Sequence, residues 1–168
     1  DVLAGVVAES DALAREAMSR IKVTYEVLEP ITDMHKAMLD DSPSVHSNGS
    51  NVLSNTLTHR GDLTATKAQS AFTTTGIFET QMIEHGFMEP ECTVAKPWGS
   101  MADGVEVFSS GQGIFDDRKQ IAKILGLPLE KVRVILVPNG GGFGGKEDLT
   151  TQGHAALAAH LLQMPVKV

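Results

Sequence analysis

The run Lys131-Val132-Arg133-Val134-Ile135-Leu136-Val137 leads directly into Pro138-Asn139-Gly140-Gly141-Gly142-Phe143-Gly144-Gly145-Lys146-Glu147. The first part, residues 131–137, is rich in β-branched residues and ends at a proline, which predicts a β-strand. From Leu149 onward the apolar spacing predicts a helix whose apolar side carries Ala156, Leu157 and Leu161. A strand, a glycine-rich loop and a helix therefore follow one another, and this order predicts mixed α and β structure.

The glycine-rich loop has a composition that suits contact with a ligand. Five of the six residues at positions 140–145 are glycines, so the backbone can adopt positive φ and a ligand can approach its N–H groups without meeting a Cβ. Since the loop is predicted to open directly onto the helix, the helix dipole favours an anion there, such as a phosphate, a pyrophosphate or a metal-bound oxo group. A flexible turn is the alternative interpretation.

Two nucleotide-binding patterns also match this loop, and both matches are weak. Gly140-x-Gly142-x-x-Gly145 satisfies the dinucleotide fingerprint, but the chain has no acidic residue ~20 positions later to bind a ribose. The spacing of Gly140 and Gly145-Lys146 is that of a Walker A loop, but Glu147 stands where a Ser or Thr should ligate magnesium. A nucleotide-binding domain is therefore kept as a secondary hypothesis.

Further elements are predicted on both sides of the loop. Upstream lie a strand at 105–109 and a helix at 117–125, which Gly126 and Pro128 end. A short strand is predicted at 76–80. Residues 166–168 follow a helix-stopping proline and are predicted as the first half of a strand.

The N-terminal part is predicted to fold as strand, helix, strand. Residues 2–7 form an apolar run, Ser10 is the predicted N-cap of a helix, and residues 23–27 alternate as a strand does. The helix should bury one stripe, made of Leu13, Ala17 and Ile21. Periodicity then fails in a segment rich in turn residues, which predicts a long connector between two structural units. Both ends of the chain look interrupted, so we expect a fragment of a longer protein.

Composition excludes several classes of protein. The chain has 168 residues, 42% hydrophobic and 21% charged, with a net charge of −7, so the basic surface of a nucleic-acid-binding protein is missing. Cys92 is the only cysteine, which excludes a disulfide framework and favours the cytoplasm. Because of the net negative charge, nucleic acid is not an expected partner. No signal peptide and no apolar run of membrane-spanning length are recognised, so a membrane is not an expected partner either.

Four motifs together resemble the xanthine dehydrogenase / aldehyde oxidase family of molybdenum hydroxylases. They are Glu84-His85-Gly86-Phe87-Met88-Glu89-Pro90-Glu91, the turn Ser109-Ser110-Gly111-Gln112, the helix end Leu125-Gly126-Leu127-Pro128, and the loop from Gly140 to Glu147. The resemblance implies an α+β fold, with the end of an α/β hammerhead domain followed by the first part of a molybdopterin-binding α/β domain. The corresponding bounds are 1–30 for the hammerhead end, 31–55 for a connector and 56–168 for the molybdopterin-binding part.

The resemblance also implies roles for individual residues. Gln112 should face the molybdenum centre, with its side-chain amide in reach of an oxo ligand, and the backbone of Phe143 should approach the same centre while its ring lines the site. Both would lie near the metal without ligating it. Gly141, Gly142 and Gly144 complete the implied cofactor-binding set. Without the resemblance, Gln112 is a surface residue in a turn and Phe143 an anchor of the loop.

Glu147 matches the family position that binds the heterocycle in purine-hydroxylating members. A carboxyl there can hydrogen-bond ring nitrogens and exocyclic oxygens, whereas aldehyde-oxidising members tend to have an apolar residue. The expected substrate is therefore an N-heterocycle such as a purine, with an aldehyde as the alternative. The simpler interpretation is that Glu147 and Asp148 favour a helix N-terminus. The acidic segment around Glu84 and His85 lacks metal-ligand spacing and is expected to pack near the cofactor domain.

By the same resemblance, the chain is one part of an enzyme. The activity implied is hydroxylation of a purine or aldehyde with water as the oxygen source, with electrons passed to 2Fe–2S clusters and FAD in other domains or subunits. The cofactor is molybdenum-molybdopterin, with the cytosine dinucleotide form left open. The catalytic base, a glutamate, is expected downstream, so this chain holds no catalytic residue and needs other segments or subunits for activity. The competing interpretation is a non-catalytic assembly or binding module of the same fold.

Overall fold

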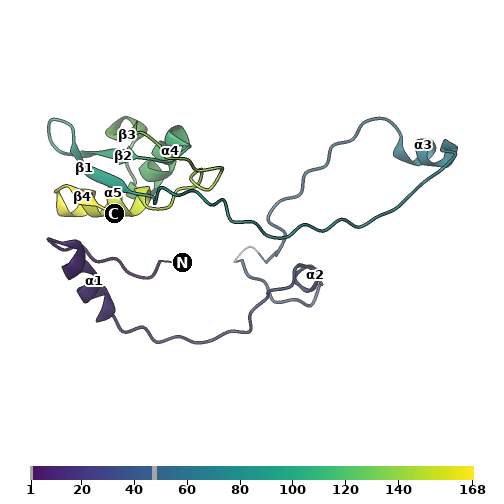
Figure 1. The fold of residues 1–168 in the computed structure, drawn as a ribbon, viewed down its shortest axis with the longest axis horizontal. Coiled ribbons are helices and arrows are strands. Elements are labelled where there is room, and N and C mark those ends of the chain that lie inside the picture. The colour runs from purple at the N-terminus through teal and green to yellow at the C-terminus, as the bar shows by residue number, and fades with distance from the viewer. Residues whose placement is uncertain (1, 47–48) are drawn as a thin grey trace. The chain divides into compact units, whose positions relative to one another are not determined.

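The computed structural model of the chain describes residues 2–46 and 49–168 (Figure 1). It divides into two compact units. One consists of Asp1–Ile21 and Gln81–Val168, and the other of Lys22–Thr80. The expected domain bounds, 1–30, 31–55 and 56–168, stay a prediction, and Asn48 of the connector lies outside the described residues.

A mixed four-stranded sheet forms the centre of the first unit, in the order β3-β2-β1-β4. Strand β1 pairs antiparallel with both β2 and β4, and β2 pairs parallel with β3. The strands are β1 (Thr93–Trp98), β2 (Gly104–Ser109), β3 (Val132–Leu136) and β4 (Val166–Lys167). The strands expected at 105–109, 131–137 and 166–168 are therefore confirmed, whereas the sequence does not predict β1.

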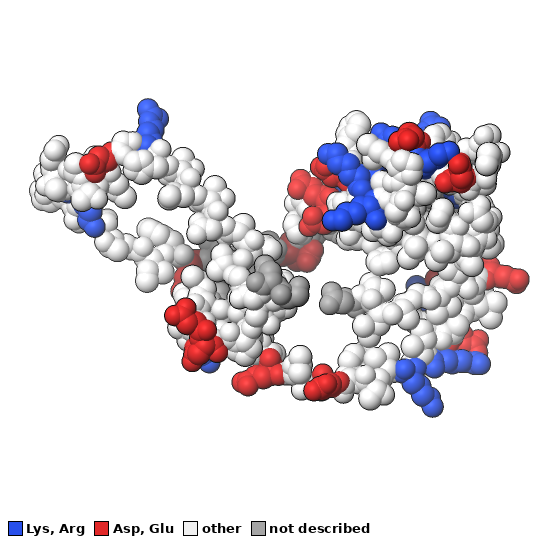
Figure 2. All heavy atoms as spheres, turned by 180° about the vertical axis from the view of Figure 1, so that it is seen from behind, with Lys and Arg blue, Asp and Glu red and all other residues white. Residues whose placement is uncertain are grey.

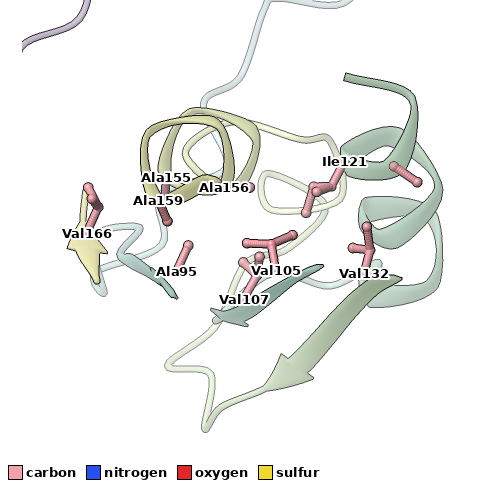
Figure 3. Packing of buried hydrophobic residues seen from close by; sticks show 10 residues of the cluster. Ala95, Val105, Val107, Ile121, Val132, Ala155, Ala156, Ala159 and Val166 are labelled. Atoms are coloured by element: carbon pink, nitrogen blue, oxygen red, sulfur yellow. The ribbon is translucent and has the colours of Figure 1, made fainter. Parts of the chain in front are cut away.

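Two helices pack on this sheet and bury its core. Helix α4 (Ile114–Leu125) connects the parallel strands β2 and β3 and contacts β3, while α5 (Gln152–Leu162) contacts β1, β2 and α4. Figure 3 shows the small side chains of α5 facing the valines of β2. The core residues are Ala95, Val105, Val107, Ile121, Ala122, Val132, Ala155, Ala156, Ala159 and Val166. This architecture is the α+β fold that the sequence predicts.

Helix α4 ends where the sequence predicts and begins earlier. Gly126 has φ 65, the left-handed conformation that glycine adopts most easily, and its N–H bonds back to the Lys123 carbonyl. The N-cap is Gly113, directly after Gln112, so the helix starts at Ile114 rather than at Asp117. A short 3-10 helix, η1 (Leu129–Lys131), then leads into β3.

Three further helices are short and capped by polar side chains. In the first unit, Ser10 accepts a hydrogen bond from the N–H of Leu13 at the start of α1 (Asp11–Ser19), as predicted. In the second unit, Asp33 caps α2 (Met34–Ala37) and Asp62 caps α3 (Leu63–Gln69). The N–H groups of Lys36 and His35 hold the pKa of Asp33 below its ordinary value.

Three predicted strands do not form. Residues 2–7, 23–27 and 76–80 have no strand pairing, because an isolated run with strand-like alternation leaves its backbone groups unsatisfied unless another strand pairs with it. The predicted stripe of α1 is also wrong, since the helix has no buried residue and Leu13 and Ile21 are exposed.

Helix α5 differs from its prediction in its start and in its buried face. It begins at Gln152 because residues 149–151 are not helical, and the Thr150 N–H donates to the Gln152 side chain. Ala156 is buried as expected, but Leu157 and Leu161 are exposed. Alanines and Gly153 occupy the inner side instead, since a Cβ on Gly153 would lie 2.9 Å from Ile124 of α4.

The face of the sheet away from the core carries one row of charges. The buried Glu106 of β2 pairs with Lys96 of β1 (3.0 Å) and Arg133 of β3 (3.1 Å), its neighbours in register. Exposed pairs such as Lys119–Asp116 and Lys131–Asp103 add little stability, although Lys131 lowers the pKa of Asp103. Figure 2 shows basic and acidic side chains side by side on one face of this unit.

Among residues 2–46 and 49–168, no helix combines the length and apolar character needed to cross a membrane.

Candidate functional site

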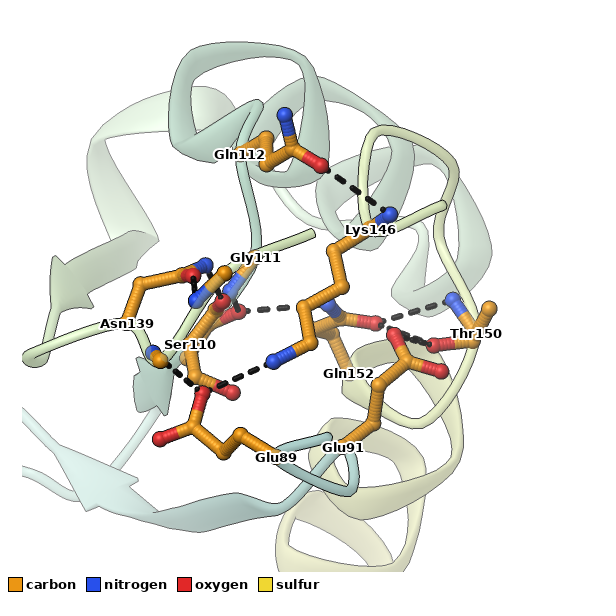
Figure 4. A network of polar contacts seen from close by, with 12 residues as sticks. Glu89, Glu91, Ser110, Gly111, Gln112, Asn139, Lys146, Thr150 and Gln152 are labelled. Carbon is orange, nitrogen blue, oxygen red and sulfur yellow. Dashed lines mark hydrogen bonds and ion pairs between the residues drawn. The ribbon is translucent and has the colours of Figure 1, made fainter. Parts of the chain in front are cut away.

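The turn after β2 and the glycine-rich loop after β3 lie together. The parallel pairing of β2 and β3 brings the ends of both strands to one edge of the sheet, and the Val137 N–H donates to the Ser109 carbonyl there. Gln112 from the turn then binds the loop through its backbone, because its N–H donates to the Lys146 carbonyl at 2.8 Å. Two motifs that the sequence singles out separately thus form one site (Figure 4).

The side chain of Gln112 has a defined orientation. Its Oε1 accepts hydrogen bonds from the backbone N–H of Gly144 (3.1 Å) and of Lys146 (3.2 Å). Two N–H donors require the oxygen of the amide at this position, so the Nε2 group points away from them. Within the described part of the chain Nε2 donates to no atom, which leaves an amide donor available to a ligand.

Glycine is required in the loop for contact as well as for conformation. A Cβ on Gly142 would lie 2.2 Å from Oε1 of Gln112, and one on Gly145 would lie 2.7 Å from the Phe87 ring and 2.9 Å from His85. These separations are far below ordinary van der Waals contact. The loop is therefore packed against side chains on two sides.

An ion pair between the buried Lys146 and the partly exposed Glu89 holds both ends of the loop. Lys146, whose side chain is fully buried, donates from Nζ to Oε2 of Glu89 at 2.7 Å and lies over the Phe87 ring. The same carboxylate oxygen accepts from the N–H of Gly140 at 2.7 Å. Glu89 thus joins the first residue of the loop to the residue after its last glycine, and these bonds hold the pKa of Glu89 below its ordinary value.

Phe143 adopts an unusual backbone conformation at the tip of the loop. Its φ is +52, a region that is costly for a residue with a bulky side chain. The ring is 75% exposed, so it does not anchor the loop in the core. Neither Phe143 nor Gly142 donates a backbone hydrogen bond to the described part of the chain. The exposed Phe143 thus has both its aromatic ring and an N–H without a partner in the described ranges, whereas Gly142 is buried.

Glu147 and Gln112 border the same hollow. It has a volume of about 540 Å³ and is lined by Gln112, Gly113, Asp116, Gln120, Glu147 and Asp148. The structure therefore brings together the residue expected at the cofactor and the residue expected at the substrate. Gly141, Gly142, Phe143 and Gly144 lie outside this lining.

The expected helix at the end of the loop is displaced. Residues 146–151 separate the last glycine from α5, so the loop does not open directly onto a helix. The N-terminus next to the site belongs to α4, whose first residue, Ile114, follows Gly113 and Gln112. The positive end of that helix dipole therefore lies beside Gln112 rather than beside Phe143.

A buried polar cluster lies behind the Gln112 turn. Ser109 Oγ accepts from the Gly111 N–H (3.0 Å) and from Nε2 of Gln152 (3.1 Å). Asp117 is only 1% exposed, and neither of its carboxylate oxygens has a hydrogen-bond partner in the described chain. Burial, together with the nearby charges of Asp116 and Glu91, raises the pKa of Asp117 to about 6, and the Ser109 hydroxyl opposes this rise slightly.

The residues present fit a polar, oxygen-rich cofactor. The loop contributes unpaired N–H groups, a glycine surface that lets a ligand approach the backbone, and the amide donor of Gln112. No cluster of three or more His, Cys, Asp or Glu side chains in the described ranges has the geometry of a metal site. The amide donor of Gln112 and the backbone donors of the loop suit a ligand that accepts hydrogen bonds through oxygen atoms.

Comparison with known proteins identifies the family. The model of the molybdopterin cofactor-binding domain matches residues 45–168. The chain belongs to this family. The molybdopterin-binding chain is also similar to the large molybdopterin subunit of nicotinate dehydrogenase from Eubacterium barkeri, with 35% identity over 100% of the chain and 39% of that subunit. These matches confirm the resemblance to molybdenum hydroxylases on which the sequence analysis rests.

Other relatives agree with this assignment. A probable xanthine dehydrogenase subunit of Bacillus subtilis is 33% identical over 100% of the molybdopterin-binding chain and 22% of its own length. Among solved structures, aldehyde oxidoreductase from Desulfovibrio gigas superposes with a TM-score of 0.81 and 26% identity, over 95% of the chain and 18% of that structure. The chain thus spans well under half the length of these relatives.

The structure reveals three site residues that sequence reasoning missed. Glu89 and Lys146 form the buried pair, and Asp117 lies unpaired behind the turn. The pair joins residues 57 positions apart, and no local pattern signals such a contact. The sequence does not predict that Asp117 is buried, because an acidic residue in the first turn of a helix is usually exposed. The packing role expected for the segment around His85 does agree with its contacts to the loop.

Proposed function

We propose that the chain forms one wall of the molybdenum-molybdopterin site of a hydroxylase that oxidises an N-heterocycle. The observation that carries the proposal is the orientation of Gln112: two loop N–H groups hold its oxygen, and its Nε2 donor is left for the cofactor. Gly141, Gly142, Phe143 and Gly144 are the residues that would contact the cofactor by their backbone. When bound, the cofactor supplies the redox chemistry of the hydroxylation.

The residues of this chain bind and orient rather than react. The amide of Gln112 donates a neutral hydrogen bond, which favours a developing negative charge without adding a positive one. The carboxylate of Glu147 can accept hydrogen bonds at the edge of the hollow, as the ring N–H groups of a purine require. The chain contains no assigned catalytic base, so we propose that other segments or subunits supply that base, the 2Fe–2S clusters and FAD. Nicotinate and xanthine dehydrogenase relatives both act on N-heterocycles, which supports this substrate class.

Cofactor content tests the proposal directly. We expect the complete protein, purified from its host, to contain molybdenum and pterin in a molar amount equal to that of the chain. Molybdenum is measured by elemental mass spectrometry and the pterin by fluorescence after oxidation. A protein without either would instead be a non-catalytic module of the same fold. Thermal stabilisation by ATP or NAD, without molybdenum, would favour the nucleotide-binding alternative.

The substrate class depends on Glu147. We expect Glu147→Ala to lower kcat/KM for a purine by about 10- to 100-fold, the loss that follows removal of one hydrogen bond to a charged group, while turnover of an aldehyde is largely retained. Glu130→Ala, an exposed acid that does not line the hollow, is the control and should leave both rates unchanged. Equal losses for purine and aldehyde would refute the assignment of Glu147 to the substrate.

A further inference from the structure

Asp117 is the buried titratable group that the proposed function does not use. Its side chain comes from the first turn of α4 and reaches the space beneath the Gln112 turn, where its Oδ2 would lie 3.2 Å from a Cβ on Gly111. That Cβ position lies 3.0 Å from Ser109 Oγ and 3.1 Å from Nε2 of Gln152. These four residues are therefore in one small cluster, and glycine at position 111 is what gives the carboxyl its room.

The hydrogen bonds of this cluster leave one donor without an assigned acceptor. Ser109 Oγ already accepts from Gly111 and Gln152, so its lone pairs are used and its hydrogen must point elsewhere. The carboxyl of Asp117 lies close to that hydroxyl, which lowers its pKa slightly, but the two groups do not have the geometry of a hydrogen bond in this structure.

The charges around Asp117 oppose its ionisation. Asp116 comes from its own helix, and Glu91 from the segment before β1. The groups that β2 and α5 contribute, Ser109 and Gln152, are neutral. No Lys, Arg or His pairs with Asp117 in the described ranges. A buried carboxylate in these surroundings would be both desolvated and repelled, so a proton on Asp117 relieves both costs.

We propose that Asp117 is a proton-holding positioning residue, whose protonation state sets how firmly Ser109 and Gly111 hold the turn that presents Gln112. When it is neutral, the Ser109 hydroxyl keeps both of its accepted bonds and the turn is fixed. When it is charged, the buried carboxylate has no counter-ion and must be solvated by water, and water that enters beneath the turn competes for the bonds that Ser109 accepts, so the turn loosens. Only the final step, from Gln112 to the cofactor, rests on the proposed function.

Hydrogen exchange of the turn is the first test. In the complete protein, protection of residues 109–113, corrected for the intrinsic rate, should fall about tenfold from about pH 5 to about pH 7, because each pH unit above the midpoint costs the neutral form a factor of ten. Asp117→Asn, which stays neutral, should remain protected at both values. Asp116→Asn, its exposed neighbour, is the matched control and should keep the wild-type pH dependence. The same dependence in Asp117→Asn, or none in the wild type, would overturn the proposal.

An infrared measurement covers the case in which Asp117→Asn does not fold. Wild-type protein with isotope-labelled aspartate should show the carbonyl band of a buried protonated carboxyl, which disappears with a midpoint near pH 6. Absence of that band at low pH would contradict the proposal. Neither readout depends on bound cofactor, so failure here and failure of the molybdenum assay are separate results.

Discussion

Gly142→Ala is expected to reduce turnover about a hundredfold, the usual cost of displacing a preorganised donor from an active site, while the chain stays folded. The added Cβ would lie 2.2 Å from Oε1 of Gln112. The clash is with the end of a flexible side chain and not with backbone, so Gln112 moves and the fold does not. It then loses its bonds from Gly144 and Lys146, and its free Nε2 no longer points in a fixed direction.

A double-mutant cycle distinguishes this mechanism from a general disturbance of the loop. In a Gln112→Ala background no amide is left to displace, so adding Gly142→Ala should cost little more. Turnover and molybdenum content of the complete protein are measured for all four variants, with circular dichroism to confirm the fold. Fully additive losses would mean that the Cβ acts on the cofactor or the backbone directly, and that Gln112 is not the group affected.

The elements that the sequence predicts correctly are those with local signals. Strand β3 has a run of β-branched residues, and the end of α4 has Gly126 in the left-handed conformation. Strand β1 has neither signal, because Lys96 and Pro97 interrupt its alternation. It forms because β2 on one side and β4 on the other supply its backbone hydrogen bonds. The same argument in reverse explains the apolar run at 2–7 and the alternating run at 23–27, neither of which has a partner strand.

The core of α5 shows how packing overrides pattern. Leucines are the natural choice for a buried stripe, yet Leu161 is 70% exposed while Ala155 and Ala159 are fully buried. The helix lies close to both the sheet and α4, and only small side chains fit between them. The size of the inner residues, rather than hydrophobicity alone, decides which face of this helix is buried. A single sequence does not reveal how closely the helix packs against the sheet and α4.

For the candidate site, too, the sequence predicts some features and not others. The family resemblance picks out Gln112, Phe143 and Glu147, because they stand in recognisable motifs. It does not show that Gln112 is oriented by the loop itself, nor that Glu89 closes the loop from a distant segment. The first contact follows from the parallel pairing of β2 and β3, and the second from the segment that precedes β1. Both become visible only once the sheet is assembled.

Glu89→Gln is expected to cause the largest loss of stability. It leaves the ammonium of Lys146, which is fully buried, without a counter-ion. Leaving a buried charge unpaired is costly, but water that reaches the partly exposed position 89 offsets part of the cost, so the folding equilibrium constant should fall about tenfold to a hundredfold. Lys146→Met should cost less, because it removes the buried charge and leaves Glu89, which is partly exposed and still accepts from Gly140. The double variant should recover most of the loss seen in Glu89→Gln, measured by urea unfolding of the complete protein.

The contribution of this pair should also depend on pH in a fixed direction. Because Lys146 and the Gly140 N–H hold the folded-state pKa of Glu89 below its ordinary value of 4.5, the folded protein binds this proton less tightly than the unfolded chain. The stabilisation is therefore complete above pH 4.5 and is lost as the pH falls through the lower, folded-state pKa. The difference in stability between wild type and Glu89→Gln should shrink over that range. A constant difference would mean that the carboxylate charge does not hold the loop, and that Glu89 acts by packing alone.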